Sequence, residues 1–253
     1  MKKIKLNAIV IALLLGVSFA TVSCGKKDPQ PVKPKPKPVA KEVVFEDKKL
    51  TEIIKAELKL KATEKVTEAN IKDLKKLILG GKTKEVKTLK GLEKAVELTE
   101  IDFAENAVKD LSPIKDLKKV TVLKLSSTAV EDLKALANYS TLTLFDANAA
   151  KGIKDISPLA KNVNLQTLIL ADVPVADKGL ETIKLFTKLH KLNLKTSGIT
   201  KVDELAELMS KGALLKTTAG YKDGDSELIL TGNTIKDYTP LDKYATTSVK
   251  VTK

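Results

Sequence analysis

The sequence contains few of the residues from which catalytic and nucleic-acid-binding sites are usually built. Among its 253 residues are one Cys, one His, no Trp and no Arg, and aromatic residues make up 4%. The single Cys excludes a disulfide within the chain, so the folded part must be stabilised by burial alone. Without Arg, the chain lacks the bidentate guanidinium fork that reads guanine and clamps phosphate. We therefore expect no specific nucleic-acid partner.

No catalytic or metal-binding constellation can be assembled from the residues that remain. His190, the only histidine, lies at the start of an expected strand. There is no glycine-rich phosphate loop, metal-spaced His/Cys set or Ser/His/Asp trio. Four aspartates recur at a fixed period, which indicates backbone-capping positions rather than paired catalytic carboxylates: Asp110, Asp132, Asp155 and Asp237. We expect a protein that is not an enzyme and that needs no cofactor or metal.

The net charge of +13 is concentrated at the front of the chain. Residues 1–41 hold nine lysines and one acid, whereas residues 42–253 hold 36 lysines and 31 acids. A small excess that is spread along the chain is typical of a solvated surface. The charge of the folded part therefore gives little support for a nucleic-acid interface.

The first residues have the pattern of a targeting segment. A lysine-rich start precedes an apolar run at residues 8–22, which has the length of a signal-peptide core and is short for a membrane span. The run ends in Thr21–Cys24, which resembles the lipobox of bacterial lipoproteins. The resemblance implies cleavage before Cys24 and lipidation of that residue. An ordinary signal peptide with an incidental cysteine is the alternative.

A Lys/Pro-rich segment follows the cysteine. Residues 25–40 read GKKDPQPVKPKPKPVA, a composition that cannot bury a core and favours extended polyproline II. A stiff spacer of this kind would hold a domain away from a membrane surface. We therefore predict a chain that is lipid-anchored to a bacterial membrane, at the outer membrane or the cell surface.

A repeat of about 22 residues organises the rest of the chain. Its unit is L-x-x-L-x-L, an Asn-like position held by Asn106 and Asn233, and then apolar residues three apart. The alternation predicts a short strand with two inward side chains, and the Asn is placed to bond backbone groups at the corner that follows. One coil cannot cover its own apolar faces, so neighbours must stack. Seven copies are expected, and the first apolar residue of each is Leu74, Leu98, Val120, Leu142, Leu165, Leu189 and Leu228.

Two places disturb the period. The weak fourth copy can be phased with Leu142 and Leu144 inward or with Phe145 and Ala147 inward; the second phase keeps the adjoining repeats nearly equal in length and leaves Leu144 outward. The last two copies are separated by an insertion of about 14 residues, near residues 209–227. A longer helix and turn that packs locally is the plainer interpretation of the insertion.

The repeats resemble those of bacterial leucine-rich-repeat proteins of the internalin type. Residues 106–114 (NAVKDLSPI), 153–159 (IKDISPL) and 233–241 (NTIKDYTPL) carry the resemblance, which covers about residues 44–241. It implies an α/β fold: a right-handed solenoid with a parallel sheet on the concave face, 3-10 or irregular segments on the convex face and an α-helical N-terminal cap. For the cap, we expect a helix at 47–60 with Asp47 as its N-cap and a second helix from Thr67.

These patterns divide the chain into five parts. The predicted boundaries are a signal peptide at 1–23, a tether at 24–41, a helical cap at 42–73, the repeat solenoid at 74–241 and a C-terminal cap at 242–253, where Val249 and Val251 could add a closing strand.

The concave sheet is the expected binding surface. Side chains beside the inward leucines point outward, and Val122, Leu144 and Ile169 on three successive coils could form one apolar patch. The predicted contact residues are Asp102, Val122, Lys124, Leu144, Asp146, Ile169, Lys191 and Asn193, with Tyr221 of the insertion as a further loop contact.

The sequence therefore favours a monomeric, membrane-anchored module that binds a protein partner of a host or of the same envelope, as a surface adhesin or receptor-like lipoprotein. A structural envelope scaffold without a host role is one alternative. An electrostatic binder of anionic lipid or wall polymer, acting through its lysines, is another.

Overall fold

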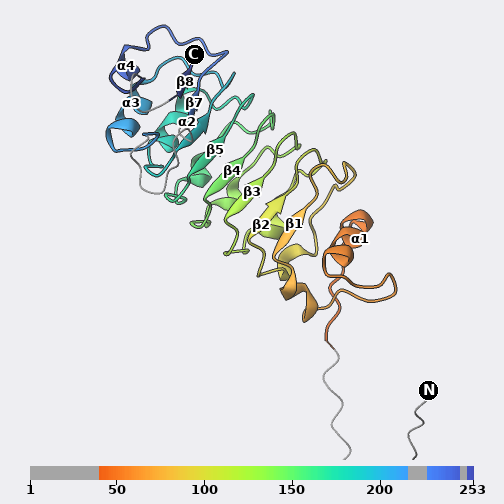
Figure 1. The fold of residues 1–253 in the computed structure, drawn as a ribbon. Helices are drawn as coiled ribbons and strands as arrows, with labels where there is room; N and C mark the ends of the chain where they lie inside the picture. The colour runs from red at the N-terminus through yellow and green to blue at the C-terminus, as the bar shows by residue number, and fades with distance from the viewer. Residues whose placement is uncertain (1–39, 216–226, 246–249) are drawn as a thin grey trace, which may run out of the picture. The chain divides into compact units, whose positions relative to one another are not determined.

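The computed structural model describes residues 40–215, 227–245 and 250–253 (Figure 1). Within residues 40–253 the buried apolar side chains run from Val43 to Leu241 as one continuous cluster, so this unit carries its own core. Across the described part of the chain, no helix is both long and apolar enough to cross a bilayer.

The unit is a stack of coils, each of which contributes one three-residue strand to a single parallel sheet (Figure 1). The strands are paired in chain order, and we call coil n the stretch from strand βn to the next strand. They are β1 (Lys76–Ile78), β2 (Glu100–Asp102), β3 (Val122–Lys124), β4 (Leu144–Asp146), β5 (Thr167–Ile169), β6 (Lys191–Asn193), β7 (Glu227–Ile229) and β8 (Lys250–Thr252). β8 is the closing strand that the sequence suggests after the seventh repeat.

The middle residue of each strand points into the core, as the L-x-L pattern predicts. In β1 to β7 this residue is fully buried: Leu77, Ile101, Leu123, Phe145, Leu168, Leu192 and Leu228. The residues on either side lie on the outer surface of the sheet because side chains alternate along a strand. Each strand is short because the chain must leave the sheet to complete its coil.

The register confirms the preferred phase of the weak fourth copy. Phe145 pairs with Leu123 on one side and with Leu168 on the other, and both Phe145 and Ala147 are fully buried. Leu144 therefore lies on the outer surface of the sheet. Adjacent residues of a strand point to opposite faces, so the alternative phase with Leu144 inward would have turned Phe145 outward.

The sequence insertion falls between β6 and β7, where Leu192 pairs directly with Leu228 although they are far apart in the chain. Helix α3 (Asp203–Ser210) occupies the first part of this long coil. Tyr221, the predicted loop contact, lies outside the described residues.

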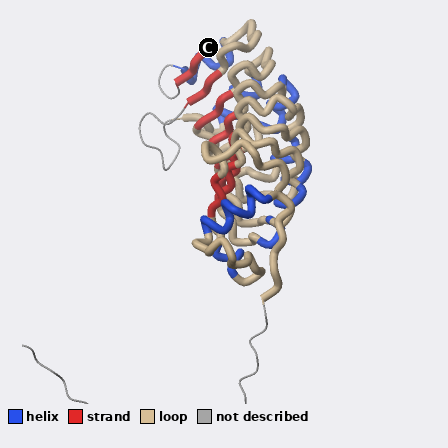
Figure 2. The backbone as a smooth tube through the Cα atoms, turned by 90° about the vertical axis from the view of Figure 1, so that its right-hand side faces the viewer, coloured by secondary structure: helices blue, strands red, loops and turns tan. Residues whose placement is uncertain are grey.

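Helical segments lie on the side of the stack away from the sheet (Figure 2). Their type changes along the chain. Coils 1 to 4 carry single 3-10 turns, η2 (Leu92–Lys94), η3 (Ser112–Ile114), η4 (Lys134–Leu136) and η5 (Ser157–Leu159), in agreement with apolar residues three apart. Coils 5 to 7 carry the α-helices α2 (Ala176–Ile183), α3 and α4 (Thr239–Ala245), which the repeat pattern did not predict. In α2 and α3 the buried residues lie three or four positions apart, so one face of each helix packs onto the stack.

The recurrent aspartates cap four of these segments, η3, η4, η5 and α4, as predicted. Their Oδ1 atoms accept hydrogen bonds from the backbone N–H two residues further on: Asp110 from Ser112, Asp132 from Lys134, Asp155 from Ser157 and Asp237 from Thr239, at 2.7–2.9 Å. Each bond pairs a backbone donor that the start of a helical turn leaves without a partner.

Two features hold the corners that follow the strands. Asn233 accepts from the N–H groups of Ser197 and Ile199, both at 3.0 Å, and donates to two carbonyls. This confirms the role expected of the Asn position. In addition, one residue in each corner has a positive φ: Gly81, Glu105, Ser127, Ala149, Asp172, Thr196 and Gly232. Most of these are not glycine, so no sequence signal marked them.

At the front of the unit, helix α1 (Lys48–Glu57) begins at Asp47 as predicted, because the Asp47 carboxylate accepts from the N–H of Leu50 at 3.0 Å. The other carboxylate oxygen accepts from Lys87 N at 2.9 Å and so joins the helix to coil 1. The second predicted helix is wrong. Only a 3-10 turn, η1 (Asn70–Asp73), forms there, since Leu77 is needed as the inward residue of β1.

Candidate binding surface

The outward residues of the sheet form two parallel rows, which we call the sheet face. The register defines the first row in β1 to β7 as Lys76, Glu100, Val122, Leu144, Thr167, Lys191 and Glu227. The second row is Ile78, Asp102, Lys124, Asp146, Ile169, Asn193 and Ile229. Neighbours within a row lie about 4.8 Å apart, so each side chain contacts those of the adjacent coils.

The lysines of the sheet face are paired with acids of the same face. Nζ–carboxylate distances are 2.7 Å for Lys76–Glu100, 3.5 Å for Lys124–Asp102 and 3.1 Å for Lys191–Glu227. Each pair joins two adjacent coils. Over β1 to β7 the face holds three lysines and four acids, so it is close to neutral although the chain is strongly basic.

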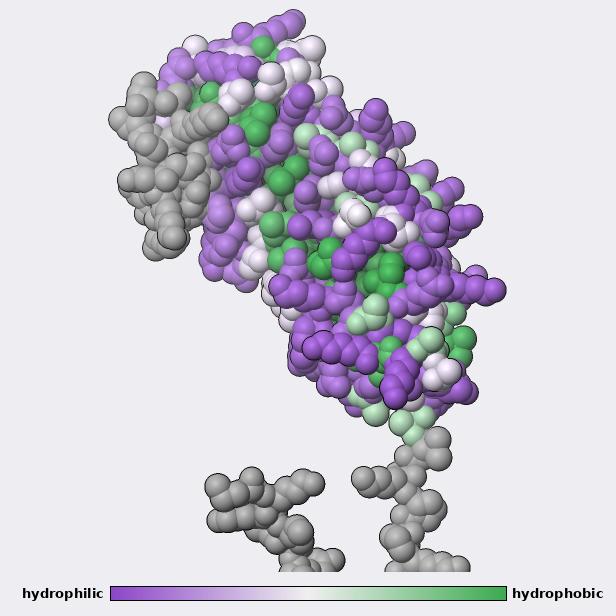
Figure 3. Space-filling view, turned by 45° about the vertical axis from the view of Figure 1, so that its right-hand side comes forward, coloured by the Kyte–Doolittle hydropathy of each residue, from purple (hydrophilic) through white to green (hydrophobic). Residues whose placement is uncertain are grey.

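The predicted apolar patch is only partly contiguous. Val122 and Leu144 are direct partners in the first row, and Thr167 follows them. Ile169 lies in the second row beside Asp146, diagonal to Leu144. Val122, Leu144 and Ile169 are each half-buried, and none of the strongly exposed large apolar residues of the described part of the chain lies on this face. Figure 3, an oblique view from the sheet side, accordingly shows small apolar areas separated by polar side chains.

Three predicted polar contacts are engaged by the backbone at the ends of their strands. Asp102 accepts from Ala104 N at 3.0 Å, Asp146 from Asn148 N at 2.9 Å and Asn193 from Lys195 N at 3.0 Å. Asp102 is only 8% exposed. These side chains close the corner turn, which leaves them less capacity for a partner than the sequence suggested.

Residues outside the predicted contact set also shape the surface. Thr167 continues the Val122–Leu144 row, and the Ser126 hydroxyl donates to Asp146 Oδ1 at 2.8 Å. Inside the stack, the fully buried Asn162 accepts from Leu142 N at 3.2 Å and donates to the Leu159 carbonyl at 3.1 Å. The repeat spacing places Thr167 outward, but no pattern distinguished Asn162 from the apolar residues at its position in other coils.

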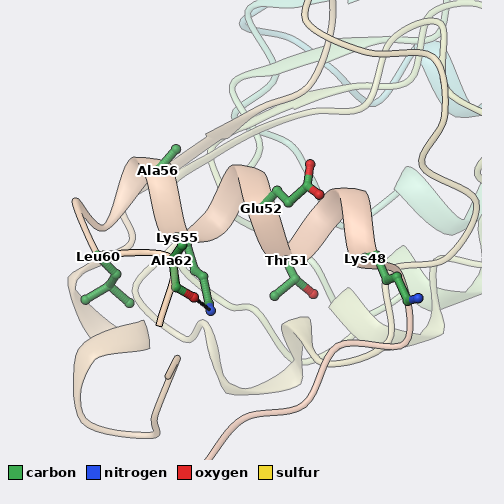
Figure 4. Close-up of a pocket in the computed structure, with 7 residues that line it drawn as sticks. All are labelled: Lys48, Thr51, Glu52, Lys55, Ala56, Leu60 and Ala62. Atoms are coloured by element: carbon green, nitrogen blue, oxygen red, sulfur yellow. Dashed lines mark hydrogen bonds between the residues drawn. The ribbon is translucent and has the colours of Figure 1, made fainter. Parts of the chain in front are cut away.

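One cavity lies away from the sheet face, along helix α1 (Figure 4). It measures about 490 Å³ and is lined by Lys48, Thr51, Glu52, Lys55, Ala56, Leu60 and Ala62. Lys55 donates to the Ala62 carbonyl at 2.8 Å, and Glu52 pairs with Lys49 at 3.1 Å. These groups serve the local structure and do not form an acid–base pair. Across the described residues, no cluster of three potential metal ligands occurs.

These features define the class of the protein. One short parallel strand per coil, an aliphatic core, side-chain caps at the corners and helical turns on the opposite side are the properties of a leucine-rich-repeat solenoid. Its described surface presents a broad sheet.

Solved structures of internalins have the same architecture. An internalin from Listeria monocytogenes (InlF) gives a TM-score of 0.69 at 26% identity over 86% of this chain and 59% of that chain. Internalin C2 of the same organism gives 0.66 at 22% identity over 86% and 100%. A leucine-rich-repeat protein from Leptospira interrogans gives 0.50 at 21% identity over 67% and 41%. The chain thus spans less than two thirds of the first of these internalins.

No family model and no curated protein sequence matches the chain. The structural neighbours show that the chain has the leucine-rich-repeat solenoid fold, with internalins among the proteins that share it.

Proposed function

We propose that the protein is a membrane-anchored module that binds another protein through the sheet face, as a surface adhesin or receptor-like lipoprotein of a bacterial envelope, and that it catalyses no reaction. The internalin-like repeat solenoid supports a binding role, since repeat stacks present extended surfaces suited to protein recognition. The partner belongs either to a host or to the same envelope.

The observation that carries the proposal is the distribution of charge on the sheet face. Lys76–Glu100 and Lys191–Glu227 close the two ends of the first row, while Val122, Leu144 and Thr167 lie between them. An uncharged centre bordered by internally paired charges is complementary to an apolar, uncharged segment of a protein. Such a partner would replace water over the centre without breaking the ion pairs.

The test is site-specific photocrosslinking on cells that produce the full chain. A benzophenone amino acid at Thr167 should yield a discrete protein adduct. The same probe at Val44 should not, because Val44 is 75% exposed but lies before helix α1 and outside the sheet. Adding Leu144→Asp should abolish the Thr167 adduct. If both positions give the same adducts, or if Leu144→Asp leaves the Thr167 adduct intact, the sheet face is not the binding site.

Anchoring is a separate part of the proposal, supported by the sequence at Thr21–Cys24 and by the Lys/Pro-rich segment behind it. Cells fed a labelled fatty acid should incorporate the label into the wild-type chain and not into Cys24→Ser. Label in both proteins, or in neither, would contradict lipidation at this cysteine. Protease treatment of intact cells would then distinguish a surface position from a periplasmic scaffold.

A further inference from the structure

One edge of the stack is rich in lysine. We call the basic edge the four segments that lead back to the sheet in coils 2 to 5: residues 115–119, 137–141, 160–164 and 184–188. Together they hold six lysines and one acid, Asp116. That excess equals the net charge of residues 42–253 as a whole, which hold 36 lysines and 31 acids.

Successive segments of the basic edge lie side by side. The Lys161 ammonium donates to the side-chain oxygen of Asn138 on the preceding coil at 3.3 Å, and the Lys188 ammonium donates to that of Asn164 at 2.5 Å. Amide oxygens orient these ammonium groups without neutralising them. Among the described residues, neither Lys161 nor Lys188 has a carboxylate within ion-pair distance, in contrast to Lys118, Lys119 and Lys184.

The same two coils expose apolar side chains on this edge. Val163 is 48% exposed and Leu185 is 44% exposed, and they are two of the four large apolar residues with strong exposure in the described part of the chain. Each lies within three positions of an unneutralised lysine. Exposed aliphatic residues beside unpaired lysines are typical of surfaces that contact an anionic bilayer, where ammonium groups meet headgroups and the aliphatic residues reach the acyl boundary.

We infer that the basic edge docks on the anionic lipid surface of the membrane, through Lys161, Lys188, Val163 and Leu185. The inference rests on the proposed anchoring for the presence of that membrane. A basic surface would add an electrostatic contact with anionic headgroups to the attachment that the lipid anchor provides. Docking by an edge keeps the sheet face, a different side of each coil, available to a partner.

The test is sedimentation of residues 41–253, which carry their own core, with two kinds of vesicle. One kind is phosphatidylcholine alone, and the other is phosphatidylcholine with phosphatidylglycerol. Binding should require phosphatidylglycerol and should weaken with added salt. Lys161→Gln with Lys188→Gln should weaken it about thirtyfold, from about one kilocalorie per lysine near the surface. The control is Lys151→Gln with Lys178→Gln, which removes two exposed lysines of coils 4 and 5 off the basic edge and should change binding less than twofold.

The apolar residues separate a membrane from a soluble polyanion. Val163→Ser with Leu185→Ser should weaken vesicle binding about tenfold and leave binding to polyphosphate unchanged. Equal vesicle binding by all variants would overturn the inference. It would also be overturned if only the lysine substitutions weakened vesicle binding and the protein bound polyphosphate tightly, since that result would assign the edge to a soluble polyanion. Since this assay lacks Cys24 and leaves the sheet face intact, its failure is distinct from failure of the proposed function.

Discussion

The corner that follows each strand depends on single residues whose side chain or backbone conformation allows the chain to turn. Asn233 bonds four backbone groups there, two donors and two acceptors, of which three belong to the preceding coil and one to its own. Water reaches such groups poorly inside a stack of coils, so a missing partner costs most of the desolvation free energy of each group. The corner residues are therefore a larger factor in stability than their polarity suggests.

Asn233→Ala should lower the free energy of unfolding by about 2–4 kcal/mol, because several backbone groups lose their partner at once. Chemical denaturation followed by circular dichroism measures the change. Asn138→Ala is the matched control: Asn138 is exposed and its side-chain oxygen accepts from Lys161, so we expect a change within about 0.5 kcal/mol. Equal effects of the two substitutions would contradict the corner role.

Ala149 tests the backbone of the same corner. Its φ of +57° is costly for a β-branched side chain, so Ala149→Val should destabilise the fold by about 1–2 kcal/mol, whereas Ala149→Gly should be nearly neutral. Denaturation midpoints of the two variants give the comparison. Ala107→Val, at an exposed position with negative φ, should have little effect; a loss as large as that of Ala149→Val would show that side-chain volume, not φ, is responsible.

At the scale of the element, four of the helical segments outside the sheet, η3, η4, η5 and α4, start from a charged cap. Hydrogen bonds from the side chain and backbone of Ser112 hold the pKa of Asp110 below its ordinary value of 3.8. Backbone and side-chain bonds do the same for the pKa of Asp132, Asp155 and Asp237. Since the folded pKa is the lower one, this stabilisation is complete above pH 3.8 and disappears as the pH falls through the lowered values.

The four caps should therefore make stability steeply dependent on acid below about pH 4. A variant with Asn at positions 110, 132, 155 and 237 keeps the accepting oxygen but cannot be protonated, so its stability should change less between about pH 5 and pH 2. Thermal unfolding across this range is the measurement. Parallel pH profiles of variant and wild type would rule out the caps as the main source of acid sensitivity.

At the scale of the whole molecule, each coil is stabilised by the coil before it and the coil after it. The core is a row of layers, each with its own inward residue, rather than one centre. A substitution should therefore cost more in the middle of the stack than at an end.

Leu168→Ala in β5 removes a fully buried side chain that has coils on both sides, and we expect a loss of about 3–5 kcal/mol. Val251→Ala in β8, which pairs with β7 alone among the described strands and is only partly buried, should cost about 1 kcal/mol. Denaturation with hydrogen exchange would show both the size and the location of each effect. A larger loss from Val251→Ala would contradict the layered description.

Most of the fold could be predicted because the same motif recurs along the chain. Side chains alternate along each strand, and each repeat contains one strand, so inward positions such as Leu123 and Phe145 could be predicted. The Asp and Asn caps could be predicted because they recur. The second helix of the front part could not be excluded, because the Ile71–Leu77 spacing fits a helix as well as a turn followed by a strand. The α-helices of coils 5 to 7 likewise depend on packing against neighbouring coils rather than on the motif.

The candidate surface was predictable in position and not in detail. Alternation placed Leu144 and Val122 outward, because outward and inward residues are fixed once the phase is known. It did not indicate that Asp102 closes a turn, that Ile169 lies in the other row, or that Lys191 pairs with Glu227 across the insertion. Those facts depend on which residues of adjacent coils meet.

The sequence by itself determined the class of the protein, the phase of its coils and the identity of its core and capping residues, because a repeated pattern specifies one local structure many times. Only the tertiary structure decided which charges on the sheet face neutralise one another and that Lys161, Val163, Leu185 and Lys188 share one edge. The physical reason is that lateral contacts in a solenoid join residues a whole repeat apart, and their register is set by the stacking of whole coils.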